Sequence, residues 1–149
     1  MAEAKSDLMM AQAVADAVGA TKRQIQLWTD AGAIHCLPDT DRQGRGSQRL
    51  YTKDELPFIA LVAAAAKAKL PIGVLTRFSE WVKDHFKAHP YTGIEDFRYL
   101  IFEVPEKNSD PKASWLFLCD DEGTAMEYIN ELHSAVVINV NKVMADLKT

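Results

Sequence analysis

Gly19-Ala-Thr-Lys-Arg-Gln-Ile-Gln-Leu-Trp28, continued by Thr-Asp-Ala-Gly32, is the stretch that decides the fold of this chain. Thr21 and Gln24 have the spacing of a capping box, in which the hydroxyl caps a helix start and the glutamine returns to the amide of the cap. Ile25 and Trp28 then lie one turn apart on the face that points inward. Gly32 ends the helix, because glycine tolerates the left-handed conformation found after many helices. The sequence therefore predicts a short, capped helix from Thr21 to Gly32.

A first helix precedes this one. Apolar side chains recur at four-residue steps in Met10, Val14 and Val18, which predicts a helix from about Leu8 to Val18 that ends at Gly19. Two short helices joined by the tight Gly19-Ala20 turn form a helix-turn-helix.

The residues after the second helix have the pattern of a wing. Ala33–Pro38 is apolar and extended, and Asp39–Gln48 is polar and contains glycines. Arg49-Leu50-Tyr51 then alternates like a short strand. A polar loop between two extended pieces is typical of the wing in a winged helix.

Two further helices are expected before residue 90. Thr52-Lys-Asp-Glu55 offers a second capping box. A helix that starts at Asp54 does not lose the backbone hydrogen bond that Pro57 would otherwise remove. Leu70-Pro71 separates this helix from a fourth one, which His89-Pro90 closes. The apolar face of the fourth helix is formed by Leu75, Phe78, Val82 and Phe86.

From Phe97 onward the pattern is that of a small mixed unit. The predicted elements are strands at Phe97–Val104 and Ser114–Cys119 joined by the loop Pro105–Ala113, a helix capped by Thr124 that runs to about His133, a strand at Ala135–Val140, and a helix from Asn141 to Leu147. We therefore predict an α+β fold with two domains. Residues 1–89 form a winged helix-turn-helix of four helices and a small wing, and residues 90–149 form a β-β-α-β-α unit for dimerisation or sensing.

Together these motifs resemble the MerR-type winged-helix DNA-binding domain over about residues 8–88. The matching stretches are Gly19–Trp28, Ala31-Gly-Ala-Ile34, Gln48–Leu56 and the turn Ala68-Lys-Leu-Pro-Ile72. The resemblance implies a recognition helix in the major groove and a wing on the phosphate backbone. Gln26 and Leu27 depart from the family, which has an arginine and a tyrosine at these positions. The long coiled coil through which family members dimerise has no counterpart after His89.

The resemblance assigns Arg23 to the recognition helix, Trp28 to its second aromatic, Arg49 to the wing arginine and Tyr51 to the aromatic that follows. The residues themselves support a DNA-binding role, since a short helix fits the major groove and spaced arginines can follow the phosphate backbone of DNA. Trp28 fits a core position as well, and Tyr51 can bury its ring while it presents its hydroxyl. The predicted DNA-binding residues are Thr21, Lys22, Arg23, Gln26, Trp28, Arg42, Arg45, Arg49 and Tyr51.

The distribution of charge agrees with this assignment although the net charge is −4. Residues 90–149 hold eleven acidic and five basic side chains, whereas residues 1–53 hold six acidic and seven basic ones. Arg42, Arg45, Arg49 and Lys53 follow one another without an intervening acid. A local basic patch matters more for phosphate contact than the global sum.

Several functions are not expected. Cys36 and Cys119 lack the spacing of a metal site, no nucleophile and base are paired in the sequence, and the acidic run Asp120–Glu122 fits the start of a helix. We expect neither an enzyme nor a bound cofactor or metal. No apolar run approaches a membrane span and no signal peptide is present, which indicates a cytoplasmic protein.

The sequence thus predicts a transcription regulator that binds a two-fold symmetric duplex site as a homodimer, held by its C-terminal unit and fourth helix. The strands near Leu100 and Leu116 are apolar on both faces, more than a lone hairpin can bury. Two alternatives remain: a protein-interaction module of the chaperone-modulator kind, and a DNA accessory factor of the excisionase kind. Salt-dependent binding to DNA separates the first alternative from the others.

Overall fold

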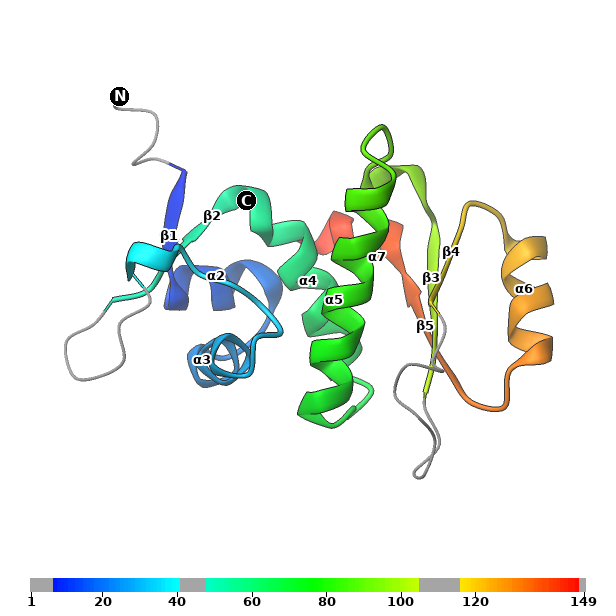
Figure 1. Ribbon diagram of the computed structural model, residues 1–149, viewed down its shortest axis with the longest axis horizontal. Coiled ribbons are helices and arrows are strands. Elements are labelled where there is room, and N and C mark those ends of the chain that lie inside the picture. The colour runs from blue at the N-terminus through cyan, green and yellow to red at the C-terminus, as the bar shows by residue number, and fades with distance from the viewer. Residues whose placement is uncertain (1–6, 41–47, 105–115, 148–149) are drawn as a thin grey trace.

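The computed structural model describes residues 7–40, 48–104 and 116–147. Within these ranges the chain forms six α-helices and two small antiparallel sheets, which confirms the expected α+β class (Figure 1). The elements lie side by side along the long axis of the molecule, with α2 and α3 at one end and α6 at the other. None of the helices in the described ranges is long and apolar enough to cross a membrane.

The first element is a strand, and the prediction of a helix from Leu8 was wrong at its start. β1 (Leu8–Met10) pairs in antiparallel register with β2 (Leu50–Thr52), with Leu8 opposite Thr52. The amide of Lys53 extends this pairing by donating to the carbonyl of Asp7 at 2.9 Å. α2 therefore begins at Ala11 and ends at Val18, because the backbone of Leu8–Met10 is committed to β2.

The turn after α2 follows the sequence closely. Gly19 has φ +74° and Gly32 has φ +83°, the left-handed conformation that glycine adopts without a steric cost. Between them lies α3 (Lys22–Asp30), whose start carries the predicted capping box. Both ends of α3 are therefore defined by residues close to them in the sequence and not by contacts with distant segments.

The second predicted capping box does not form, which corrects the expectation for Thr52. Residues Lys53–Glu55 make a turn of 3-10 helix, and α4 (Leu56–Ala66) begins only after it, without a side-chain cap from Thr52. This start places Pro57 in the first turn of α4, where a missing amide hydrogen breaks no helical bond. Pro57 thus costs no helical hydrogen bond, because α4 starts later than the predicted Asp54.

α5 (Ile72–Ala88) begins after Pro71 and ends before His89, as predicted. Its inward face carries Leu75, Phe78 and Val82, all buried, and the half-buried Phe86. A connected set of buried apolar side chains joins this face to α2 and α4 on one side and to Leu100 and Phe102 on the other. The core therefore continues across the chain position His89-Pro90.

The C-terminal elements have the predicted β-β-α-β-α order. They are β3 (Tyr99–Glu103), β4 (Leu116–Cys119), α6 (Glu122–Glu131), β5 (Ala135–Asn139) and α7 (Val140–Asp146). β3 lies in the centre of an antiparallel sheet of order β4-β3-β5. The predicted loop Pro105–Ala113 and the start of the second predicted strand, at Ser114, lie outside the described residues.

Both helix caps in this unit differ from the prediction. The carboxylate of Asp121, rather than Thr124, caps α6 by accepting from the Thr124 amide at 2.8 Å. The side chain of Asn139, rather than Asn141, caps α7 by accepting from the Lys142 amide at 3.1 Å. In each case the helix begins earlier than predicted, because the residue that ends the preceding strand or turn supplies the cap.

β3 is buried on both faces because helices of the same chain cover both. Phe102 packs edge-on against Phe78 and Trp81 of α5, with ring centroids 5.4 and 6.0 Å apart. Ile101 points the other way, into a cluster with Cys119 and Ala125 beneath α6. Figure 1 shows the sheet standing between α5 and α6. The two-sided apolarity that suggested a dimer interface is therefore satisfied within one chain.

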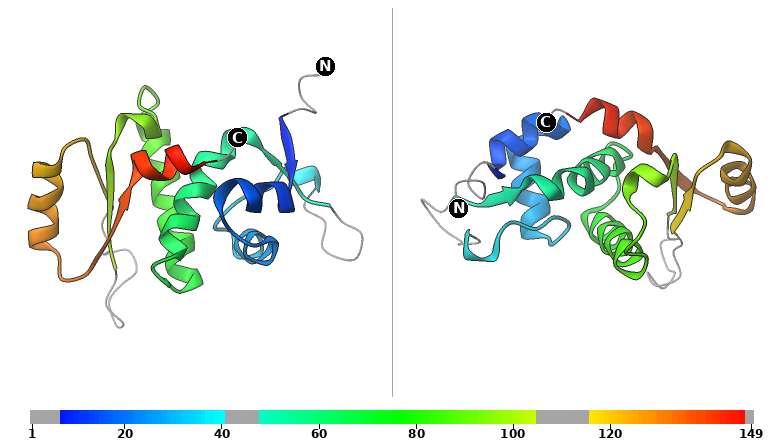
Figure 2. Two further views of the ribbon diagram at one scale, coloured as in Figure 1. Left: turned by 180° about the vertical axis from the view of Figure 1, so that it is seen from behind. Right: turned by 90° about the horizontal axis from the view of Figure 1, so that it is seen from above.

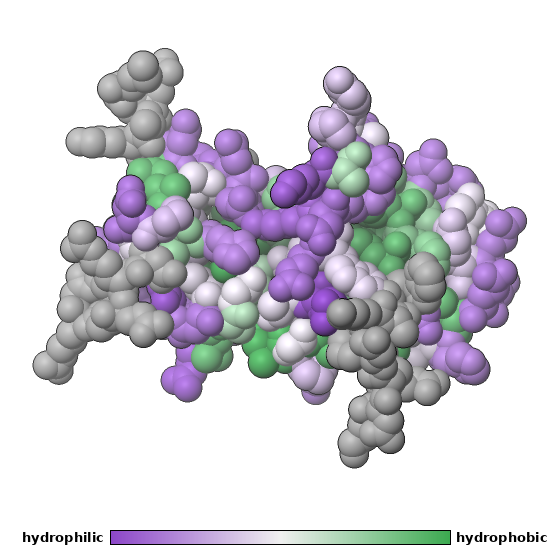
Figure 3. Space-filling view, viewed as in Figure 1, coloured by the Kyte–Doolittle hydropathy of each residue, from purple (hydrophilic) through white to green (hydrophobic). Residues whose placement is uncertain are grey.

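The front surface differs along the long axis. In Figure 3, hydrophilic side chains cover much of the middle of this face, and a hydrophobic area lies beside β3 and β4. Leu116 and Leu118 of β4 and Trp81 of α5 are half-buried and pack against the main apolar core.

Candidate nucleic-acid interface

α3 presents one polar face to solvent and one apolar face to the core. Ile25 is fully buried and Trp28 is 4% exposed, which fixes the inward side of the helix. Lys22, Arg23 and Gln26 are exposed on the remaining surface. The structure therefore brings these three predicted site residues together on one accessible helix face.

The start of α3 is held by reciprocal hydrogen bonds between Thr21 and Gln24. The Gln24 amide donates to the Thr21 hydroxyl oxygen at 3.1 Å, and the Thr21 amide donates to Gln24 Oε1 at 2.9 Å. The predicted site residue Thr21 is exposed, but its hydroxyl serves the cap. The cap gives the first turn of α3, which carries Lys22 and Arg23, a defined backbone.

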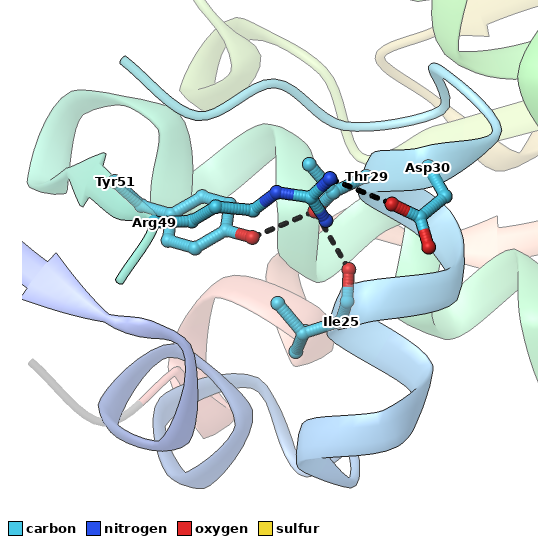
Figure 4. Close-up of polar contacts among 5 residues, drawn as sticks. All are labelled: Ile25, Thr29, Asp30, Arg49 and Tyr51. Atoms are coloured by element: carbon cyan, nitrogen blue, oxygen red, sulfur yellow. Dashed lines mark hydrogen bonds and ion pairs between the residues drawn. The ribbon is translucent and has the colours of Figure 1, made fainter. Parts of the chain in front are cut away.

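Trp28 and Tyr51 were predicted as DNA-binding residues, and both side chains are buried. The Tyr51 hydroxyl lies 2.7 Å from Thr29 Oγ1, which in turn donates to the carbonyl oxygen of Ile25 at 2.7 Å (Figure 4). Because a threonine hydroxyl has one hydrogen and the Ile25 bond uses it, Tyr51 must be the donor to Thr29. Any part that Trp28 and Tyr51 play in binding is therefore one of positioning α3.

Arg49 is engaged in an ion pair that the sequence did not predict. Its guanidinium nitrogen lies 2.7 Å from a carboxylate oxygen of Asp30, the last residue of α3 (Figure 4). The Arg49 side chain is 14% exposed and that of Asp30 is 58% exposed. Arg49 thus connects the segment before β2 to the end of α3, and little of its surface is left for a phosphate.

Arg42 and Arg45, the other two arginines of the predicted wing, lie outside the described residues. The ends of their loop are described, and hydrogen bonds hold them together. The Leu37 amide donates to the Leu50 carbonyl at 2.8 Å, and the Leu50 amide donates to Thr40 Oγ1 at 3.0 Å. Thr40 and Leu50, which lie on either side of this segment in the sequence, are therefore neighbours in the structure.

Three residues that bear on this surface were not among the predicted DNA-binding residues, although Leu27 was noted as a departure from the family pattern. Leu27 is an apolar side chain on the outward side of α3 and is 51% exposed. Asp30 and Thr29 contact the segment around β2, about twenty positions away in the chain. Helical spacing could have identified Leu27 as exposed, because it does not lie on the helix face that Ile25 and Trp28 form. The partners of Asp30 and Thr29 carry no local signal.

The described residues outside this surface include Cys119 and Asp121, whose pKa values are shifted. They contain no group of three or more His, Cys, Asp or Glu side chains placed to hold a metal ion. Burial, and secondarily Asp121 and Asp120, raises the pKa of the Cys119 thiol. A raised pKa makes this thiol a poorer nucleophile near neutral pH. The hydrogen bond from the Thr124 amide lowers the pKa of Asp121, in keeping with its role as a helix cap.

No family model matches this chain, and no curated protein matches it significantly.

Proposed function

We propose that this protein is a DNA-binding transcription regulator of the MerR type, in which α2 and α3 act as a helix-turn-helix. α3 enters the major groove of a two-fold symmetric duplex site and residues 39–48 act as the wing. The observation that carries this proposal is the exposed face of the capped helix α3, with Lys22, Arg23 and Gln26 side by side. Two cations and an amide at the start of one accessible helix can reach both phosphates and base edges.

The roles of the remaining predicted residues follow from their burial. Tyr51, Thr29 and the Arg49–Asp30 pair hold the wing side of the fold against α3. Arg42 and Arg45 belong to the segment that would follow the phosphate backbone of DNA, and hydrogen bonds join the described residues on either side of it, Leu37 and Thr40 to Leu50. We assign base and phosphate contact to α3 and the loop, and a supporting role to Tyr51 and Arg49.

The test compares cationic side chains on two parts of the molecule. Arg23→Ala and Lys22→Ala remove exposed cations of α3, while Arg98→Ala removes an exposed cation at the start of β3. Fluorescence anisotropy with a random-sequence duplex is measured at several salt concentrations. Each lost phosphate contact should lower the slope of log K against log salt by about 0.9. Arg98→Ala should leave both affinity and slope unchanged.

Fragments selected from the source genome then supply specific duplexes. If Arg23 makes a bidentate base contact, Arg23→Ala should cost about 1–3 kcal/mol on them and relax preference at one base position. Equal binding by the parent and both α3 variants would remove α3 from the DNA interface. Absence of any salt-dependent binding by the parent would reject the proposed function.

One observation favours a second candidate, a protein-interaction module with the same architecture. Leu27 exposes about half of its surface on α3, beside the three polar residues. An apolar side chain on an exposed helix face is more useful against a protein groove than against phosphates. Under this alternative the parent shows no salt-dependent DNA binding, and Leu27→Ala weakens capture of the protein partner while Arg23→Ala does so less.

A further inference from the structure

β5 is an edge strand whose outer side is open. It pairs with β3 on one side, and among the residues that the structure describes the sheet order β4-β3-β5 leaves its other side without a neighbouring strand. Figure 2, left, shows β5 from the back of the molecule, where α7 continues from its end toward α2 and no described helix crosses the strand. The residues Ala-Val-Val-Ile-Asn contain no lysine, proline or bulge, the devices that usually protect an edge from pairing.

The register shows which backbone groups of β5 point outward. The amide of Val140 donates to the carbonyl of Arg98, and the amide of Val104 donates to the carbonyl of Ser134. Hydrogen-bonded pairs alternate along an antiparallel ladder, so Ile138 and Val136 face β3 with their amides and carbonyls. The N–H and C=O groups of Val137 therefore point away from β3, and the amides of Ala135 and Asn139 point the same way.

The side chains next to this open edge are apolar. Val137 is 46% exposed, although it lies on the face of the sheet that α6 covers. Tyr128 of α6 stacks on Phe117 of β4 with ring centroids 4.0 Å apart, which fixes the flank of α6 nearer to β4. Helical spacing then places Met126, which is 52% exposed, on the opposite flank, toward β5. Val137 and Met126 form an apolar margin along the edge.

The strand is also compatible with its own copy. In an antiparallel pairing centred on Val137, residue 135 lies opposite residue 139 of the second copy. The stretch Ser134–Asn141 contains no charged side chain, so the two-fold pairing places no like charges opposite each other. Two backbone hydrogen bonds join the central valines, and the outward amides of Ala135 and Asn139 supply the flanking ones.

We propose that two copies of this chain dimerise by antiparallel pairing of β5 with β5, centred on Val137. The result is a continuous six-stranded sheet with a two-fold axis at Val137, flanked by α6 of each copy. This inference names the interface of the dimer in the proposed function and rests on that function for the purpose of the dimer. A two-fold pairing uses the same patch on both copies and therefore closes after two chains.

The experiment measures the oligomeric state of the full chain without DNA. Sedimentation velocity is recorded over a range of protein concentrations for the parent, for Val137→Lys and for Ala88→Lys. Ala88→Lys adds the same charge at an exposed position in the last turn of α5, outside the edge strand. We expect a dimer for the parent and for Ala88→Lys, and a dissociation constant at least about tenfold weaker for Val137→Lys, because two like charges would face each other.

Hydrogen exchange of the parent gives a second readout that needs no variant. The Val137 amide should be protected at concentrations where the dimer forms and should exchange freely on dilution. A parent that stays monomeric, a dimer that Val137→Lys leaves intact, or an unprotected Val137 amide in the dimer would each overturn the interface. Because DNA is absent from these experiments, they do not test DNA binding, which is tested separately by the salt dependence of affinity.

Discussion

The hydroxyl of Tyr51 lies 2.7 Å from Thr29 Oγ1 and connects β2 to the last turn of α3. Tyr51 is fully buried, and Thr29 passes the hydrogen-bond chain on to the backbone of Ile25. The orientation of the candidate recognition helix therefore depends on a side chain that follows the predicted wing.

The first prediction concerns this bond. Tyr51→Phe keeps the ring and removes the donor, so Thr29 loses a partner in a partly buried site. We expect a loss of about 1–2 kcal/mol in the free energy of unfolding, measured by urea denaturation. Tyr91→Phe is the matched control, because Tyr91 is 99% exposed and the same substitution there should have little effect. Equal effects at both positions would contradict a structural role for the Tyr51 hydroxyl.

The second prediction concerns the ion pair between Arg49 and Asp30. Asp30 is largely exposed, so solvent screening limits the pair to less than about 1 kcal/mol in a double-mutant cycle. Asp30→Asn removes a negative charge next to the candidate interface. DNA affinity at low salt should therefore increase in Asp30→Asn, as measured by anisotropy with a random duplex. A decrease would indicate that the pair is needed to hold the binding conformation.

The third prediction contrasts two threonines with the same local motif. Thr21 caps α3 with its side chain, whereas Thr52 makes no cap bond before α4. Thr21→Ala should cost about 1 kcal/mol of stability. Thr52→Ala should remain within about 0.5 kcal/mol of the parent in the same thermal or urea unfolding experiment. A reversal of this order would show that the capping box of Thr21 does not hold in solution.

The fourth prediction concerns pH. Burial of the imidazole, and secondarily the neighbouring His89, lowers the pKa of His85 below its usual value of 6.5. Protonation of His85 therefore favours the unfolded chain. The stability that the neutral His85 imidazole contributes is present above about pH 6.5 and is lost as the pH falls through the lower folded-state pKa. The free energy of unfolding, measured from about pH 8 to about pH 5, should fall more steeply in the parent than in His85→Gln. Parallel curves would remove His85 from this dependence.

Some of the fold could be predicted because the signals are local. The capping box at Thr21, the glycines at 19 and 32 and the end of α5 at His89 depend on residues within one or two helical turns. Such hydrogen bonds between near neighbours need no distant partner, although the matching box at Thr52 does not form, because Thr52 belongs to β2 and a 3-10 turn follows it. The apolar stretch Phe97–Val104 and the β-branched stretch Ala135–Val140 likewise predicted strands, and the strands in the structure are shorter by three residues and one residue.

The sequence by itself thus determined the helix pair α2–α3, the order of the C-terminal elements and the polar face of α3. Only the tertiary structure decided that Leu8–Met10 is a strand, because its partner Leu50–Thr52 lies about forty residues later. The same holds for the burial of Tyr51 and the pairing of Arg49 with Asp30. Each depends on contacts between distant segments, whose geometry is set by packing of the whole core and leaves no periodic trace in the chain.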